Sequence, residues 1–351
     1  MAATALMEAS PEVRDAIRKV AEGGSLTEGE AHSVMCRVMD GEATAAQIGA
    51  LLMALRAKGE TVDEITGFAR AMREHATRVR PDAVGYVDTC GTGGDGRDTF
   101  NISTVAAFVV AGAGVPVAKH GNRSVSSACG SADVLEALGV RIDITPGEMA
   151  RCVDECGVGF LFAQALHPSM RHAAGPRREM GVRTVFNVLG PLTNPAGAKR
   201  QLLGVFDAGL APVMAEVAGR LGAEKVLVVH GDPGLDEVSV CGQTTICVWD
   251  GREVTCSTVA PEDLGLRRRE IEELRGGDPK TNARIAMSVL DGEQGAAREA
   301  VLANAAAALV AAGAAESLAH GVEVAARSID SGEARARLDA LRQMTGAMEG
   351  E

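Results

Sequence analysis

A glycine-rich segment over residues 88–104, DTCGTGGDGRDTFNIST, follows a predicted strand and precedes a predicted helix. In open α/β sheets ligands bind at the carboxyl ends of strands, where glycine lets backbone N–H groups approach an anion and the next helix N-terminus adds a favourable dipole. Ser103 and Thr104 can add hydroxyl donors at the start of that helix. The segment predicts a phosphate-binding loop, although a glycine-rich turn without a ligand is the competing interpretation of such a motif alone.

The same segment contains a dinucleotide-type fingerprint, because Gly91, Gly93 and Gly96 have the spacing GxGxxG. Its context disagrees with that class of site. The predicted helix begins several residues too late, and the next strand ends in Lys119 and His120 rather than in the acid that would hold a ribose 2′-hydroxyl. The chain also lacks a GxxxxGK[ST] motif, so the sequence disfavours a nucleotide cofactor.

A second segment, KHGNRSVSSACGS over residues 119–131, places cations, an amide and several hydroxyls directly after the next predicted strand. Lys119 and Arg123 can neutralise phosphate oxygens, and a guanidinium can hold two of them at once. Each residue alone is explained more simply as a surface group. Two such clusters at neighbouring strand ends favour a shared anion site, so we expect a phosphorylated small molecule as ligand.

Two adjacent carboxylates, Asp236 and Glu237, end a turn that follows a third predicted strand. Mg²⁺ commonly takes one or two carboxylates together with substrate phosphates and waters. The pair therefore predicts a magnesium ion beside the phosphate site. Taken alone, the two acids would be solvated loop charges.

A fourth segment, residues 167–195, is rich in cations and turns. Within it, Arg177 is the cation that could meet an acidic second substrate. His167 and His172 are spaced i, i+5, which is a poor spacing for a metal pair on one helix face, so no zinc site is predicted there.

The elements that must position these residues fall into two parts. The first eighty residues predict helices only, because Ser10 and Pro11 form a good helix start and three hydroxyl-x-x-Glu/Gln capping boxes follow, each ahead of apolar residues at helical spacing. The boxes are Thr27 with Glu30, Thr44 with Gln47, and Thr61 with Glu64.

From about residue 84 short β-branched runs alternate with helical stretches, which predicts an α/β fold with a mostly parallel sheet flanked by helices. Helices are expected over residues 105–111, 132–138 and 297–312, and after a fourth capping box at Thr145. The expected strands are residues 84–88, 115–118, 140–144, 158–163, 226–230 and 245–249.

The composition limits the possible partners. The formal net charge is −12 and aromatic residues make up only 3% of the chain, which together argue against nucleic acid and anionic membranes as partners. Eight cysteines show neither a CxxC pair nor zinc-type ligand spacing, as expected in a reducing cytoplasm. The first residues lack the pattern of a secretory leader, and no run of apolar residues is long enough to span a membrane. We therefore expect a cytoplasmic protein.

Taken together, these segments resemble the anthranilate phosphoribosyltransferase family of tryptophan biosynthesis over nearly the full chain. The matching runs stand in the family's order: GTGGD (91–95), NIST (101–104), KHGNRSVSS (119–127), GSADVLEALG (130–139), RTVFNVLGPLTNP (183–195) and LDE (235–237). The resemblance implies an Mg²⁺-dependent glycosyltransferase that moves phosphoribose from phosphoribosyl pyrophosphate to the amine of anthranilate and releases pyrophosphate. It also implies a small helical domain over residues 1–82, joined by helices from about 171–190, a catalytic α/β domain over 83–351, and a homodimer through the helical domain.

The resemblance further implies roles for individual residues. Lys119 and Arg177 are expected to act in catalysis, and Gly91, Asn122 and Arg177 to contact anthranilate. Ser103, Asp236 and Glu237 are expected to bind magnesium. The expected contacts to phosphoribosyl pyrophosphate are Gly91, Gly94, Asp95, Thr99, Asn101, Ile102, Ser103, Thr104, Lys119, His120, Gly121, Asn122, Arg123, Ser126, Ser127 and Ser131.

Two other functions remain open at this point. A pyrimidine-nucleoside phosphorylase shares the overall fold and also handles ribose and phosphate, but the paired carboxylates and the KHGNR run suit a metal-bound pyrophosphate better than free phosphate. A catalytically silent relative that binds nucleic acid is disfavoured by the charge and the few aromatic residues.

Overall fold

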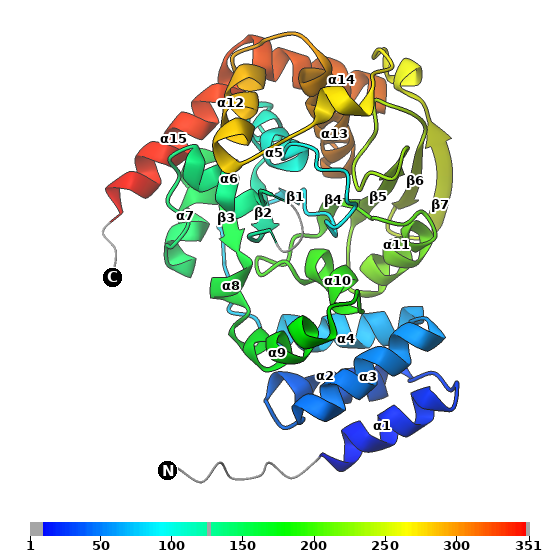
Figure 1. Cartoon of the computed structure of the whole chain (residues 1–351). Helices are drawn as coiled ribbons and strands as arrows, with labels where there is room; N and C mark the ends of the chain where they lie inside the picture. Colours follow the sequence, from blue (N-terminus) through cyan, green and yellow to red (C-terminus); the bar gives the residue numbers. More distant parts are fainter. Residues whose placement is uncertain (1–9, 125–127, 349–351) are drawn as a thin grey trace. The chain divides into compact units, whose positions relative to one another are not determined.

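The structure is a computed structural model and describes residues 10–124 and 128–348 (Figure 1). The chain forms two compact units. One consists of Met1–Thr77 with His167–Thr193, and the other of Arg78–Leu166 with Asn194–Glu351. We call them the helical unit and the sheet unit.

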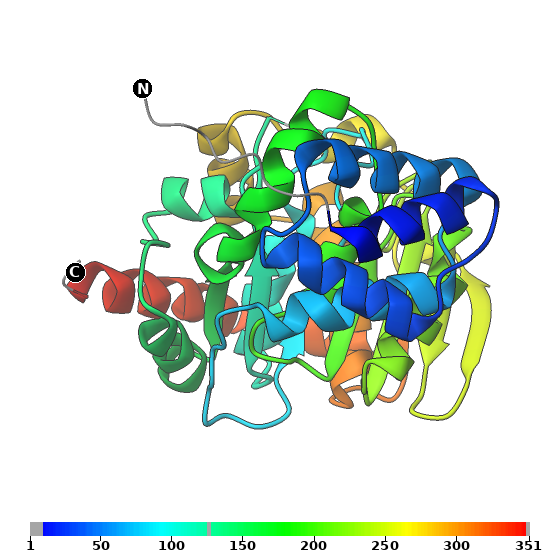
Figure 2. The same cartoon turned by 90° about the horizontal axis from the view of Figure 1, so that it is seen from below.

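The helical unit begins with four helices, α1 (Pro11–Ala21), α2 (Glu28–Met39), α3 (Ala45–Lys58) and α4 (Val62–Glu74), drawn in blue in Figure 2. The three capping boxes predicted for α2, α3 and α4 are confirmed, because in each the threonine hydroxyl accepts the third residue's N–H and that residue's side chain accepts the threonine N–H. The second stretch adds η1 (Pro168–Met170), α9 (Arg171–Met180), α10 (Phe186–Leu189) and η2 (Gly190–Thr193).

The helical unit is held together by apolar stripes on its helices. The stripe predicted on α2, which includes Val34 and Val38, is buried, and α2 packs directly against α4. Gly67 of α4 makes that approach possible, because a Cβ atom there would lie 2.3 Å from the Glu28 carbonyl oxygen. The close packing brings polar side chains at the edges of α2 and α4 into contact.

The sheet unit is built on seven strands in the order β3-β2-β1-β4-β5-β6-β7. Strands β1 to β5 run parallel, and β6 and β7 are antiparallel additions at one edge, so the predicted α/β class with a mostly parallel sheet is confirmed. The strands are β1 (Val87–Asp88), β2 (Val117–Gly121), β3 (Val158–Phe162), β4 (Arg200–Gly204), β5 (Lys225–Gly231), β6 (Thr244–Trp249) and β7 (Val254–Val259).

Helices flank this sheet (Figure 1). The two helices α5 (Ile102–Gly112) and α13 (Ala296–Ala312) pack together and contact strands β1 to β5, while α11 (Leu210–Arg220) packs against β5 and β6. The other helices are α6 (Ser131–Ala137), α7 (Pro146–Cys156), α8 (Ala163–Leu166), η3 (Pro261–Leu264), η4 (Ile271–Leu274), α12 (Pro279–Leu290), α14 (Leu318–Asp330) and α15 (Glu333–Ala347). Within the described ranges, none of the helices is both long and apolar enough to cross a bilayer.

One predicted strand is wrong. Residues 140–144 are extended but join no sheet, and the Arg141 N–H donates to the Thr345 hydroxyl of α15 instead of to a neighbouring strand. The alternation of apolar and charged residues in this segment arises because Val140, Ile142 and Ile144 are buried in the core while Arg141 and Asp143 are not. Strands β4 and β7 were not predicted.

Cysteines in a reducing compartment are expected to be free thiols, and one pair differs from this expectation. Cys247 of β6 lies directly opposite Cys256 of β7, and the two form a disulfide. Residues nine positions apart meet here because the two strands form an antiparallel hairpin. The other cysteines within the described ranges are free thiols.

Candidate functional site

The sheet unit has a site where its strand order reverses. From β1 the chain passes to β2 and β3 on one side, and it returns to β4 and β5 on the other. In open parallel sheets the loops at the carboxyl ends of the strands part at such a switch point and leave a crevice for a ligand. The loops after β1, β2 and β5 carry the three predicted clusters.

Asp236 joins the loop after β5 to the glycine-rich loop after β1. Its carboxylate accepts the Gly93 N–H at 2.6 Å. The approach requires glycine at position 91, because a Cβ atom there would lie 2.8 Å from a carboxylate oxygen of Asp236. Gly94 and Asp95 continue the same loop, and the Asp95 carboxylate accepts the Arg97 N–H. Two predicted clusters thus meet across 143 residues of sequence.

Glu237 and Lys119 meet at the start of α5. The Ser103 N–H donates to the Glu237 carboxylate at 3.2 Å, and the Lys119 ammonium donates to the Ser103 hydroxyl at 3.3 Å. Lys119 is only 4% exposed and also donates to the Thr89 carbonyl oxygen at 2.9 Å. The three strand ends therefore converge on Ser103, with one cation and one carboxylate beside it.

The site holds more negative than positive charge. Desolvation raises the pKa of Asp236, and the nearby charge of Asp95 raises it further. Desolvation also raises the pKa of Glu237, the charge of Asp236 adds to this, and the charge of Lys119 opposes it. Three carboxylates share one buried ammonium, so this site is stabilised by any further cation it admits.

The donors here suit magnesium. Asp236, Glu237 and the Ser103 hydroxyl offer oxygen ligands only, which Mg²⁺ prefers, and neither histidine nor a free thiolate competes among them. Cys90 lies nearby, but desolvation raises the pKa of its thiol far above neutrality, so that this sulfur stays protonated. The residues that the sequence predicted as metal ligands therefore fit a hard divalent cation.

Asp88 is the first residue of the glycine-rich segment, and although no role was predicted for it, it anchors the strands beneath the site. Its carboxylate accepts the His120 N–H at 3.1 Å and the side-chain amide of Asn194 at 2.8 Å. The same Asn194 amide donates to the Ala118 carbonyl oxygen. Desolvation raises the pKa of Asp88 to about 6, and Lys119 and these donors oppose the rise. This network fixes the register of β1 against β2, and thereby the position of Lys119 relative to the loop after β1.

We predict that Asn194→Ala lowers the free energy of unfolding by about 2–4 kcal/mol, because it removes one donor from a buried carboxylate and the side-chain donor from a buried carbonyl oxygen. Urea unfolding followed by circular dichroism measures the change. Gln243→Ala, at an exposed position, is the matched control and should change stability by less than about 0.5 kcal/mol. Equal effects of the two substitutions would show that the network contributes no stability.

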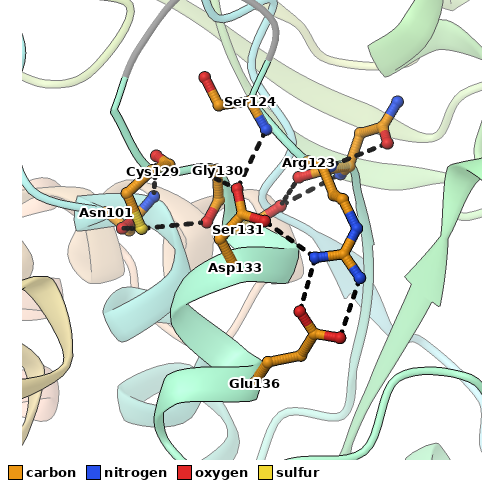
Figure 3. A network of polar contacts seen from close by, with 9 residues as sticks. Asn101, Arg123, Ser124, Cys129, Gly130, Ser131, Asp133 and Glu136 are labelled. Carbon is orange, nitrogen blue, oxygen red and sulfur yellow. Dashed lines mark hydrogen bonds and ion pairs between the residues drawn. The ribbon is translucent and has the colours of Figure 1, made fainter. Parts of the chain in front are cut away.

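The second predicted segment forms its own network around the N-terminus of α6 (Figure 3). The Ser131 hydroxyl accepts the Asn122 N–H and donates to the Asn122 carbonyl oxygen. Gly121 lies against this hydroxyl, because a Cβ atom there would be 2.4 Å from it. The Asp133 carboxylate accepts the N–H groups of Gly130 and Ser124. The loop is thereby folded back onto the helix.

Arg123 is already paired within this network. Its guanidinium donates to Glu136 at 2.5 Å and 2.9 Å and to Asp133 at 2.9 Å, and it lies over the Phe162 ring. A phosphate at Arg123 would have to compete with these two carboxylates. Ser126 and Ser127, which were also expected to contact phosphoribosyl pyrophosphate, lie outside the described residues.

The remaining predicted residues lie on the segment that leads into α5. The Asn101 side chain donates to the Cys129 carbonyl oxygen and accepts from Asn282, so it ties the first loop to the second. Thr99 forms an isolated antiparallel β-bridge with Arg275 through the backbone. Ile102 and Thr104 are buried, and the Thr104 hydroxyl has no partner among the residues that the structure describes. Thr104 and Lys119 both line one small cavity.

Arg177 belongs to α9 in the helical unit. Its guanidinium carbon lies 5.0 Å from the centre of the Phe186 ring, and desolvation lowers its pKa. Across the described part of the chain no carboxylate pairs with it. The ring supports the guanidinium, and an unpaired cation held in this way is suited to the carboxylate of an acidic ligand.

Comparison with known proteins identifies relatives of both units. Residues 83–335 match the family described as "Glycosyl transferase family, a/b domain". Residues 14–76 match the family described as "Glycosyl transferase family, helical bundle domain". An anthranilate phosphoribosyltransferase of Anaeromyxobacter sp. (strain K) is 59% identical over 335 residues, which cover 95% of this chain and 98% of the relative. One from Moorella thermoacetica is 58% identical, over 93% of this chain and 96% of the relative.

Solved structures agree. The crystal structure of anthranilate phosphoribosyltransferase from Thermus thermophilus matches with a TM-score of 0.90 at 46% identity, over 95% of this chain and 100% of that one. The Saccharomyces cerevisiae enzyme in complex with PRPP and Mg matches with a TM-score of 0.87 at 27% identity, over 96% of this chain and 98% of that one.

Proposed function

The chain belongs to the anthranilate phosphoribosyltransferase family, and on that premise we propose that it transfers phosphoribose from phosphoribosyl pyrophosphate to the amine of anthranilate. The products are N-(5-phosphoribosyl)anthranilate and pyrophosphate, and the reaction is a step of tryptophan biosynthesis. Relatives that are 59% and 58% identical to this chain are named anthranilate phosphoribosyltransferases, which supports the proposal.

The observation that carries the proposal is the convergence on Ser103. The loop after β1 offers amide N–H groups, β2 offers the Lys119 ammonium, and the loop after β5 offers two carboxylates, all joined by the contacts of Gly93 and Ser103. An activated phosphoribose needs these three things together, because its diphosphate is anionic, binds a divalent cation and leaves as charge develops.

Asp236, Glu237 and the Ser103 hydroxyl would hold magnesium, which supplies charge neutralisation to the departing diphosphate. As the bond between C1 of the ribose and the diphosphate oxygen breaks, C1 develops oxocarbenium character. Lys119 keeps its ammonium fixed by the Thr89 and Ser103 bonds, so that it faces the developing negative charge without reorganising. The glycine-rich loop supplies further N–H donors to phosphate oxygens.

The acceptor amine of anthranilate is a neutral nucleophile, so positioning contributes more than a general base. We assign the anthranilate carboxylate to Arg177, whose guanidinium is stacked on Phe186 and otherwise unpaired within the described ranges. Gly91 and Asn122 are the proposed contacts of anthranilate on the sheet unit.

Arg177→Ala should raise KM for anthranilate about 10–100-fold while KM for phosphoribosyl pyrophosphate changes little, because a charge-assisted hydrogen bond contributes about 1.5–3 kcal/mol. Steady-state kinetics with each substrate varied in turn measures both constants. Arg178→Ala, which removes the exposed neighbouring cation, is the control. An unchanged KM for anthranilate in Arg177→Ala would refute the assignment.

Magnesium should stabilise the protein more at high pH than at low pH. Both acids have raised folded pKa values, so their contribution to stability without a cation is largest below the unfolded pKa and is lost as the pH rises through the folded pKa. Mg²⁺ binds the ionised form. The increase in melting temperature on adding Mg²⁺ should therefore be larger at about pH 8.5 than at about pH 6. The reverse order would contradict these pKa shifts.

The decisive experiment mixes purified protein with phosphoribosyl pyrophosphate, Mg²⁺ and anthranilate and follows the loss of anthranilate fluorescence. We expect a loss that depends on all three components. To test the phosphorylase alternative, phosphate and a pyrimidine nucleoside replace the substrates, and no turnover is expected. Unchanged fluorescence in the first mixture, from a protein that is folded by circular dichroism, would overturn the proposed function.

A further inference from the structure

The helical unit contains a cluster of potential metal ligands that is separate from the acid pair of the sheet unit. His32 and Cys36 lie one turn apart on α2, and Glu74 is the last residue of α4. The close packing of α2 on α4, which Gly67 permits, brings the three side chains together. One ligand atom from each lies within 4.8 Å of the others.

The distances approach those of a tetrahedral site. The His32 Nε2 atom is 2.8 Å from the Glu74 carboxylate and 3.8 Å from the Cys36 sulfur. Zinc bonds of about 2.0–2.3 Å place neighbouring ligand atoms about 3.3–3.8 Å apart. Small side-chain rotations would therefore be enough to enclose an ion. The three residues supply one nitrogen, one sulfur and one oxygen ligand, a mixture that suits a borderline-soft cation and not magnesium.

The surroundings leave room for an ion to enter. The His32 and Glu74 side chains are 32% and 50% exposed, so the cluster opens to solvent. The neighbouring groups are committed elsewhere. His75 lies between the Ala71 carbonyl oxygen and the Asp40 carboxylate and contacts both, and Arg37 pairs with Glu12 and Glu42. Neither side chain is therefore paired with Glu74.

We propose that His32, Cys36 and Glu74 form a second metal site, which binds one Zn²⁺ ion and leaves the fourth position to water. Three protein ligands with an open fourth position are typical of zinc sites that exchange a ligand. The bound ion would connect α2 to α4 across their interface. The inference does not depend on the proposed function, because all three ligands belong to the helical unit.

Binding would change the state of the thiol. Burial raises the pKa of Cys36, and the charges of Glu74 and Asp40 raise it further while Arg37 opposes them, so that without a cation the sulfur carries a proton. A metal ion takes the thiolate and releases that proton. Zinc binding should therefore acidify a weakly buffered solution and strengthen as the pH rises.

The test uses the full chain, stripped of metal with a chelator that is then removed, and kept reduced with a phosphine. Co²⁺ is added as a spectroscopic substitute for Zn²⁺. We expect a near-ultraviolet thiolate-to-cobalt band and a visible band of tetrahedral type, both saturating at one equivalent and both lost when Zn²⁺ is added. The absence of a thiolate band in the unmodified protein would overturn the proposal.

Variants assign the ligands. Cys36→Ser should abolish the near-ultraviolet band, and His32→Gln and Glu74→Gln should each weaken Co²⁺ binding at least about 10-fold. The control is Cys241→Ser, which removes a partly buried thiol of the sheet unit and should leave the spectrum unchanged. Calorimetric Zn²⁺ titration and melting curves accompany each variant, so a misfolded protein is recognised. A band that persists in Cys36→Ser would refute this site, as would equal loss in Cys241→Ser.

Discussion

Replacing Asp236 and Glu237 together, as Asp236→Asn with Glu237→Gln, should lower kcat/KM about 1,000-fold or more and remove its dependence on magnesium, because metal-ion charge stabilisation contributes several kcal/mol. The amide oxygens of the variant can still accept the N–H groups of Gly93 and Ser103, so the loops should keep their positions. The loss would therefore report the missing charge.

Initial rates across a range of Mg²⁺ concentrations measure this effect. Glu323→Gln, an exposed charge change on α14, serves as the control and should retain full activity. The apo form of the double variant should also melt higher at alkaline pH than the unmodified protein, because two desolvated carboxylates have been neutralised. Full magnesium-dependent turnover in the variant would exclude the two acids as metal ligands.

Lys119→Met should lower kcat about 100–1,000-fold, the usual cost of removing one preorganised donor from developing negative charge. Methionine keeps an unbranched apolar side chain that is one atom shorter than that of lysine. The loss should be larger in kcat than in KM for anthranilate, because the ammonium would act on the departing diphosphate and not on the acceptor.

The substitution also removes the positive charge that lowers the pKa of both Asp88 and Glu237, so the pKa of each should rise further. The protein should then need a higher pH to bind Mg²⁺. Lys280→Met, at an exposed position on α12, is the matched control. A kcat within about threefold of the unmodified protein, with the fold intact by circular dichroism, would exclude Lys119 from transition-state stabilisation.

Local signals in the sequence predicted local structure well. Each capping box needs only a hydroxyl and a carboxylate or amide three residues apart, and both bonds form within one turn, so Thr27, Thr44, Thr61 and Thr145 all begin the helices they predicted. Strands depend on partners elsewhere in the chain. Residues 140–144 have a strand-like alternation but no neighbouring strand, whereas Arg200–Gly204 pairs on both sides as β4 with β1 and β5.

The predicted site shows the same division. The glycine-rich loop, Lys119 and the acid pair could be selected from residue types at strand ends. Asp88 and Asn194 lay inside segments that had been selected and Asn282 outside them, but none of the three showed its structural role, because their partners are 32, 106 and 181 residues away. The cluster of His32, Cys36 and Glu74 was missed for the same reason, since Cys36 belongs to no cysteine pair and the acid beside it comes from another helix.

By itself the sequence determined the chemistry available to this protein: an anion-binding loop, a lysine at the next strand end, a carboxylate pair for a hard cation, and helices whose ends are specified by capping. Only the tertiary structure decided which of these groups act on one another. Parallel strands carry the ends of β1, β2 and β5 to one edge, where Ser103 meets Lys119 and Glu237. Desolvation at that place sets the charge states, and it depends on the surrounding atoms rather than on neighbours in sequence.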